Sequence, residues 1–284
     1  MKEKLKIITR NATVDVYLTN CKLIKSFDSS LKYRIISTIK NYFNKLGDSE
    51  FAIEQDETST IMIEEEKLNL TDFAFYYIDE NEDLFSDLKM GTKSISLKYV
   101  EAILNKIEYT EEYQTLNIVY NDLIDFLNDK IDDDFDTIKP VISSLFEKKQ
   151  LIKLLQMTLM NDDLEINDND LEVEDKIIIQ LNMIKKISRY EHRKTIILLK
   201  VSKFIEEYQN IIDTFNENVS FMIFFDELNV NIQPEDLLIL EKDKVIDLYD
   251  DNIIFDLCMN YYADISISKM KEKLVEKVIL SSKI

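Results

Sequence analysis

The chain has 284 residues and a formal net charge of −20, with 55 acidic side chains against 35 basic ones. Hydrophobic residues make up 45% of it and aromatic residues 10%, which predicts a folded protein rather than a disordered one. The charge argues against a protein that coats nucleic acid or an anionic membrane uniformly, although it leaves room for a local basic surface.

The opening quarter of the sequence predicts short strands around one helix. Apolar runs place the strands at 5–8, 14–18, 22–25, 51–54, 60–64 and 73–78. The first two strands are expected to form a hairpin that turns at Asn11 and Ala12. The helix has apolar residues spaced three or four apart, at Leu31, Ile35, Ile39 and Phe43. Ser29 or Ser30 would cap its start, and Gly47 would end it.

Between Gly91 and about residue 192 the apolar spacing is helical. Three stripes follow one another, at Leu97, Val100, Leu104 and Ile107, then at Leu116, Tyr120, Leu123 and Leu127, then at Val141, Leu145, Ile152, Leu155 and Leu159. Pro140 suits the start of the third helix. Residues 94–192 are therefore expected to form a helical limb inserted into an α/β head.

Residues 195–226 predict a parallel β-α-β unit. Two continuous apolar runs, 195–199 and 219–225, flank an amphipathic stretch, and strands buried on both faces of a parallel sheet have this appearance. The expected fold class is an α/β head with a mixed or parallel sheet, built from 1–93 and 193–252, with the helical limb inserted. Residues 253–284 would be a C-terminal extension, helical around Met270, Leu274 and Val278.

Several catalytic classes lack their required residues. The two glycines, Gly47 and Gly91, lie far apart and do not form a phosphate-binding loop or a dinucleotide fingerprint. His192 is the only histidine, so with Cys21 and Cys258 it does not supply a zinc site. No Gly-x-Ser-x-Gly motif is present for a serine nucleophile. These absences argue against nucleotide hydrolysis, dinucleotide binding, zinc chemistry and a serine nucleophile, whereas the 55 acidic residues allow almost any arrangement of carboxylates.

The acidic run 161–175 suggests a cation site. Its oxygen donors suit Ca²⁺, which takes six to eight oxygen ligands in flexible geometry. The candidate ligands are Asp163, Glu165, Asp168 and Asp170. The run lacks the glycine of an EF-hand loop, and a solvated acidic loop explains the same residues.

Basic residues gather in two places that could contact phosphate groups. The first group is Lys185, Lys186, Arg189, Arg193 and Lys194, and the second is Lys148, Lys149 and Lys153. Solvated helix faces that offset nearby acids explain both groups equally well.

The order of these elements resembles the ring-forming DNA-binding accessory protein encoded by the fourth gene of type II-A CRISPR loci. Five stretches carry the resemblance: 1–43, 60–64 with 70–80, 123–129 with 163–167, 193–200 with 221–227, and 238–246. The resemblance spans roughly residues 1 to 250 and consists of strand and apolar patterns rather than catalytic signatures.

The resemblance implies a nucleotide-hydrolase-like head without its phosphate loop, bearing a helical limb. It implies a homotetrameric ring, supported by Ca²⁺, that threads the ends of double-stranded DNA and serves CRISPR spacer acquisition without chemistry of its own. The implied partners are double-stranded DNA, other CRISPR adaptation proteins and the RNA-guided effector nuclease. The two basic groups would supply the phosphate contacts.

Two other functions remain open from the residues alone. The first is an acidic protein that mimics the charge of DNA and blocks a DNA-binding partner. The second is a metal-dependent nuclease or phosphotransferase, which would need acids at the carboxyl ends of strands, such as Asp226 and Glu227. No apolar run is long enough for a transmembrane helix, and the start lacks a signal peptide, so a cytoplasmic location is expected.

Overall fold

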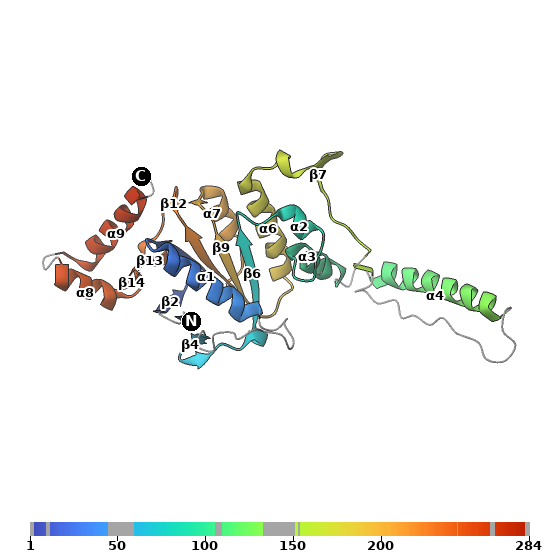
Figure 1. Cartoon of the computed structure of the whole chain (residues 1–284), viewed down its shortest axis with the longest axis horizontal. Helices are drawn as coiled ribbons and strands as arrows, with labels where there is room; N and C mark the ends of the chain where they lie inside the picture. The colour runs from blue at the N-terminus through green and yellow to red at the C-terminus, as the bar shows by residue number, and fades with distance from the viewer. Residues whose placement is uncertain are drawn as a thin grey trace. The chain divides into compact units, whose positions relative to one another are not determined.

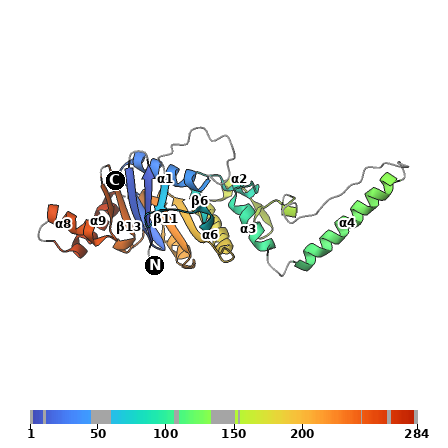
Figure 2. The same ribbon diagram turned by 90° about the horizontal axis from the view of Figure 1, so that it is seen from below.

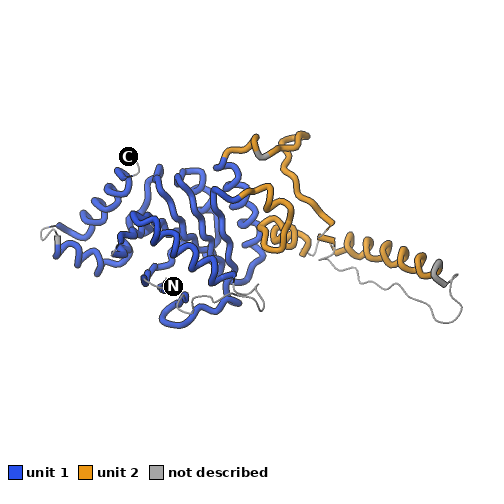
Figure 3. The backbone as a smooth tube through the Cα atoms, in the orientation of Figure 1, with its two compact units in different colours: residues 1–82, 173–284 blue, residues 83–172 orange. Residues whose placement is uncertain are grey.

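The computed structural model describes residues 3–9, 12–44, 60–105, 110–132, 151–152, 154–242, 244–261 and 265–281. It divides the chain into two compact units, residues 1–82 with 173–284 and residues 83–172 (Figure 3). The fold is mixed α/β, as the sequence predicts. The expected limb runs from 94 to 192, whereas the second unit runs from 83 to 172, so helix α6 (Val173–Ser188) belongs to the first unit. Residues 253–284, expected as a separate extension, also belong to the first unit.

The first unit is built on a six-stranded sheet in the order β14-β13-β3-β11-β9-β6 (Figure 1). Five strands run parallel, and β14 pairs antiparallel with β13 at one edge. The strands are β3 (Cys21–Ser26), β6 (Phe73–Asp79), β9 (Lys194–Lys200), β11 (Val219–Phe225), β13 (Leu237–Glu241) and β14 (Lys244–Asp247). The predicted β-α-β unit is confirmed, since β9 and β11 are parallel neighbours joined through α7 (Glu206–Ile212).

A smaller antiparallel sheet has the order β2-β1-β4-β5. Its strands are β1 (Glu3–Thr9), β2 (Ala12–Leu18), β4 (Thr60–Ile63) and β5 (Glu66–Lys67). The first two pair along their whole length, from Glu3 opposite Leu18 to Thr9 opposite Ala12, so the predicted hairpin is confirmed. Part of its turn and the predicted strand at 51–54 lie outside the described residues.

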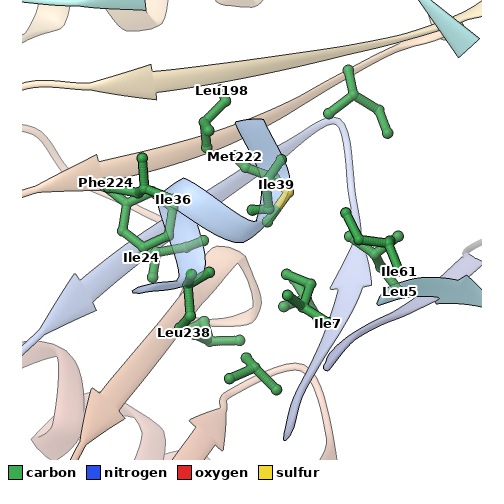
Figure 4. Close-up of a cluster of buried hydrophobic side chains, with 14 of the residues drawn as sticks. Leu5, Ile7, Ile24, Ile36, Ile39, Ile61, Leu198, Met222, Phe224 and Leu238 are labelled. Atoms are coloured by element: carbon green, nitrogen blue, oxygen red, sulfur yellow. The ribbon is translucent and has the colours of Figure 1, made fainter. Parts of the chain in front are cut away.

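Helix α1 (Ser29–Asn44) joins the two sheets through one apolar core. Ile35 and Ile39 of this helix are each 1% exposed, and they belong to a cluster that includes side chains from both sheets. Figure 4 shows Ile36 and Ile39 among Ile24, Met222 and Phe224 of the large sheet, with residues of the small sheet beside them. The predicted apolar face of this helix therefore forms the main core.

The other face of the large sheet is covered by α6 and α7, which contact each other. Figure 2 shows α1 and α6 on opposite sides of the strands. Ile177, Leu181 and Ile184 form the buried stripe of α6, and the helix contacts β6. Burial of this stripe on the sheet explains why α6 belongs to the first unit. Coverage of both faces explains the continuous apolar runs of β9 and β11.

The second unit contains helices α2 (Leu84–Leu88), α3 (Ile95–Leu104) and α4 (Thr110–Asp132) and the hairpin β7 (Leu159–Asn161) with β8 (Leu164–Ile166). The first two predicted limb stripes are confirmed as α3 and α4, except that Ile107 lies outside the described residues. Val141 and Leu145 of the third stripe also lie outside them, and its end is wrong, because Leu155 is not helical and Leu159 begins a strand. Asp87 joins α2 to α3, since its carboxylate accepts hydrogen bonds from the backbone N–H groups of Ile95 and Ser96.

The C-terminal stretch forms two helices, α8 (Asp251–Tyr261) and α9 (Ile267–Ser281), which contact each other. Helix α9 also contacts β12 (Glu227–Leu228) and the short helix η4 (Pro234–Asp236). Met270 and Val278 of α9 are buried. Within the described ranges, no helix has the length and apolar character needed to span a membrane.

Candidate nucleic-acid interface

The carboxyl ends of the parallel strands are where open α/β sheets place their ligands. Only Phe27 and Asp28 separate β3 from α1. The Asp28 carboxylate accepts hydrogen bonds from the backbone N–H groups of Ser30 at 2.9 Å and Leu31 at 3.0 Å. Because a carboxylate already holds these first amides, the start of α1 does not offer them to a phosphate.

The neighbouring charges at this edge are paired with one another. Lys200 lies 2.9 Å from Asp79, and Lys32 lies 2.7 Å from Asp226, between nitrogen and carboxylate oxygen in each case. Burial alone would raise the pKa of Asp79, but hydrogen bonds from Tyr77, Lys200 and Asn81 outweigh it and lower this pKa below its usual value. Burial and the same carboxylate raise the pKa of Tyr77.

The two loops that follow β9 and β11 meet at this edge. Lys203 and Phe204 of β10 pair in parallel with Glu227 and Leu228 of β12. Lys25 is 7% exposed and donates a hydrogen bond to the Asp226 backbone carbonyl, and burial lowers its pKa. In the part of the chain that the structure describes, no three His, Cys, Asp or Glu side chains are arranged to hold a metal, Asp226 and Glu227 included.

The first basic group lies between the end of α6 and the start of β9, and residues 185–194 are called the basic segment below. Lys185 and Lys186 occupy the last turn of α6, where positive charge also stabilises the helix dipole. Both are partly exposed, and Arg189 is exposed just beyond the helix. None of these three has an ion pair with another described residue, which leaves their charge available to a ligand.

Arg193 and Lys194 differ from these three because each is paired with a carboxylate. Arg193 contacts Glu191 through Nη2 to Oε2 at 2.6 Å and through Nε to Oε1 at 2.9 Å. These hydrogen bonds lower the pKa of Glu191 and raise that of Arg193. Lys194 forms an ion pair with Glu3 of β1. The sequence therefore groups five cations of which the structure already neutralises two.

A cavity of about 570 Å³ lies beside Lys194, at the amino ends of β3, β9 and β11. Its acidic lining residues are Glu3, Asp213, Glu217 and Asp236. Lys194 is the one Lys or Arg among the described lining residues, so the cavity disfavours an anion. Cys21 also lines it, and burial raises the pKa of this thiol and keeps it protonated.

The other predicted basic group and part of the acidic group lie outside the described side chains. Lys148, Lys149 and Lys153 fall beyond the described residues, and the side chain of Asp168 is not described. Asp163 lies in the turn between β7 and β8, beside Asp162, whose φ of 52° suits an aspartate in a tight hairpin. Asp163 and Glu165 are exposed.

The Asp170 carboxylate stabilises its own turn, because it accepts a hydrogen bond from the Asn167 backbone N–H at 2.8 Å. Over the described side chains, the structure does not gather Asp163, Glu165 and Asp170 into a metal-holding group. Calcium binding by this run therefore stays a prediction from the sequence.

Two relevant residues, Glu191 and Glu3, were not among the predicted site residues. Glu191 could have been found, because it stands two positions before Arg193 in the same charged segment. Glu3 leaves no such signal, because 191 positions separate it from Lys194 and the contact exists only after β1 and β9 have folded.

Comparison with known proteins gives a match in fold. No protein-family model matches the chain, and no curated protein matches it. Among solved structures, the crystal structure of Stu0660 of Streptococcus thermophilus is similar, with a TM-score of 0.70 and 18% sequence identity. The match covers 91% of this chain and 80% of that one. At this identity the similarity shows a shared fold.

Proposed function

We propose that this chain is a double-stranded-DNA-binding protein of CRISPR spacer acquisition that holds DNA by its phosphates and performs no catalysis. The order of sequence elements described above supports this proposal, and the fold shared with Stu0660 extends over both units. The carboxyl edge agrees with it as well, because Asp28 occupies the start of α1, where a nucleotide-hydrolase fold would need a phosphate-binding loop.

One observation carries the DNA-binding proposal. Lys185, Lys186 and Arg189 stand together at the end of α6 without ion pairs to other described residues, in a chain whose net charge is −20. Cations left unpaired amid such an excess of acids attract a polyanion locally. Phosphate contacts position a protein on DNA without reading the bases, so binding is expected to be independent of sequence.

A single copy offers few contacts, and this favours assembly of several copies around the duplex. The resemblance implies a homotetrameric ring, in which the basic segments would face a common channel and the acidic surface would face outward. In the same proposal Ca²⁺ binds the acidic run of the second unit and stabilises it. A mass measurement in solution with and without Ca²⁺ tests both features, and a monomer under both conditions would contradict the ring.

Binding to linear and closed-circular duplexes of equal length tests the function itself. A ring that takes up DNA ends should bind the linear form more tightly, and the affinity should fall steeply as salt rises. A clear preference for linear DNA is expected, because the closed circle offers no end. Absent or salt-insensitive binding to both forms would contradict DNA binding and would favour the DNA-mimic alternative.

A further inference from the structure

We infer that Glu191 and Glu3 are internal counter-ions that limit how tightly the basic segment holds DNA. This inference rests on the proposed function, because it concerns two cations of the same basic segment. It follows from the different states of the five cations. Three of them have no ion pair to a described residue, whereas Arg193 and Lys194 each face a carboxylate that a phosphate would have to replace.

The pair between Arg193 and Glu191 uses the fork of the guanidinium. Two of its nitrogens donate to the two carboxylate oxygens, and the Arg193 backbone N–H donates to Oε1 at 3.2 Å. A third nitrogen reaches the Phe73 carbonyl at 3.4 Å. The donors suited to a bidentate phosphate contact are thus engaged, and Glu191 would repel a phosphate that approached beside it.

The pair is nevertheless open to exchange. The Arg193 side chain is 48% exposed and that of Glu191 is 17% exposed. Partly exposed ion pairs of this kind contribute little to stability, so a duplex that delivers several phosphates at once can displace the carboxylate. Glu191 therefore lowers the affinity for DNA without closing the site.

Lys194 is limited in the same way but by more than one acid. Its side chain is 55% exposed and pairs with Glu3, which is 22% exposed. Asp213 and Glu217 line the same cavity as Lys194. Removing the Glu3 charge leaves these acids in place, so we expect a smaller gain in affinity at Lys194 than at Arg193.

The test compares duplex binding by Glu191→Gln, Glu3→Gln and a matched control, Glu241→Gln. Glu241 pairs with Lys277 at 2.7 Å and is 32% exposed, so the control changes the net charge equally while its own pair is with a residue outside the basic segment. Fluorescence anisotropy with a labelled linear duplex is measured across a series of salt concentrations. Circular dichroism confirms that each variant is folded, and Glu191→Ala serves as a second variant at that position.

Glu191→Gln should bind roughly three to ten times more tightly than wild type, and Glu3→Gln roughly two to three times. Glu241→Gln should remain within about twofold, because distant charges are screened. The slope of log affinity against log salt should steepen by up to about 0.9 for Glu191→Gln, since one further phosphate is contacted. The gain should disappear in the double variant Glu191→Gln with Arg193→Gln.

The outcomes separate the inference from the function on which it rests. If wild type binds duplex but Glu191→Gln behaves as Glu241→Gln does, the counter-ion inference is wrong and DNA binding stands. If neither wild type nor any variant binds duplex at low salt, the proposal of DNA binding is contradicted, and the counter-ion inference is contradicted with it. A gain that persists without Arg193 would also overturn the inference, because it would come from net charge alone.

Discussion

The carboxyl edge of the large sheet and the basic segment use lysine and arginine in different ways. At the carboxyl edge, Lys200 pairs with Asp79 of β6, and Lys32 pairs with Asp226, which follows β11. In the basic segment, Lys185, Lys186 and Arg189 have no such partner among the described residues. This contrast shows that the number of lysines in a region does not locate a phosphate site. Ion pairs with nearby acids determine which cations remain available to bind phosphate.

The largest loss of stability should come from breaking a fully buried ion pair of the first unit. Lys22 is 0% exposed, lies 2.5 Å from Asp247 and also donates to the Glu235 carbonyl at 2.8 Å. Lys22→Met would leave a buried carboxylate without its cation, which should cost about 3–5 kcal/mol of unfolding free energy in urea denaturation. Lys22→Met with Asp247→Asn should recover part of the loss, because no unpaired charge then remains.

Lys200→Met is the control at the carboxyl edge. Its side chain is 30% exposed, so loss of its pair with Asp79 should cost only about 1 kcal/mol of unfolding free energy. Equal losses of unfolding free energy for Lys22→Met and Lys200→Met would show that burial does not determine how much an ion pair contributes to stability.

Calcium should have an intermediate effect if the acidic run of the second unit holds it. At ten times its dissociation constant, a bound ion adds about 1.4 kcal/mol to stability and raises the melting temperature. The double variant Asp163→Asn with Glu165→Gln should lose this shift, whereas Asp256→Asn, an exposed acid of α8, should retain it. An unchanged melting temperature for wild type, read by differential scanning fluorimetry, would remove calcium from the proposal.

The smallest predicted change in stability is at the carboxyl edge, and it depends on pH. The pKa of Asp79 is lower in the folded protein than its usual value, so its contribution to stability is present above about pH 4. That contribution is lost as pH falls through the folded pKa. Asp79→Asn should therefore cost about 1 kcal/mol at pH 7 and progressively less below pH 4. A cost that stays constant with pH in urea denaturation would contradict this assignment.

Local apolar patterns were sufficient to predict much of the fold. The runs of β9 and β11 are buried on both faces, and the stripe from Leu31 to Ile39 forms the core side of α1. The hairpin β7–β8 was missed because each strand has only three residues, too few for an alternating pattern to distinguish a strand from a loop. The place of α6 was missed because its apolar stripe does not encode which unit it covers.

The candidate site was less predictable than the fold. The basic segment is visible as a cluster of charges in the sequence, but its division into paired and unpaired cations depends on Glu3, which only folding brings to Lys194. The predicted cations Lys148, Lys149 and Lys153 lie outside the described residues, and their role stays a prediction. Charge clusters thus locate a candidate surface, while tertiary contacts determine which of its charges can act.

The salt dependence of duplex binding tests the central claim most directly, with Lys185, Lys186 and Arg189 replaced together by glutamine. If these three cations contact phosphates, the triple variant should lose at least tenfold in affinity, and its log–log salt slope should fall by about 2–3 relative to wild type. A matched triple variant of the paired cations Lys4, Lys40 and Lys277 should leave the slope nearly unchanged. An equal slope for wild type and the Lys185, Lys186 and Arg189 variant would contradict the account.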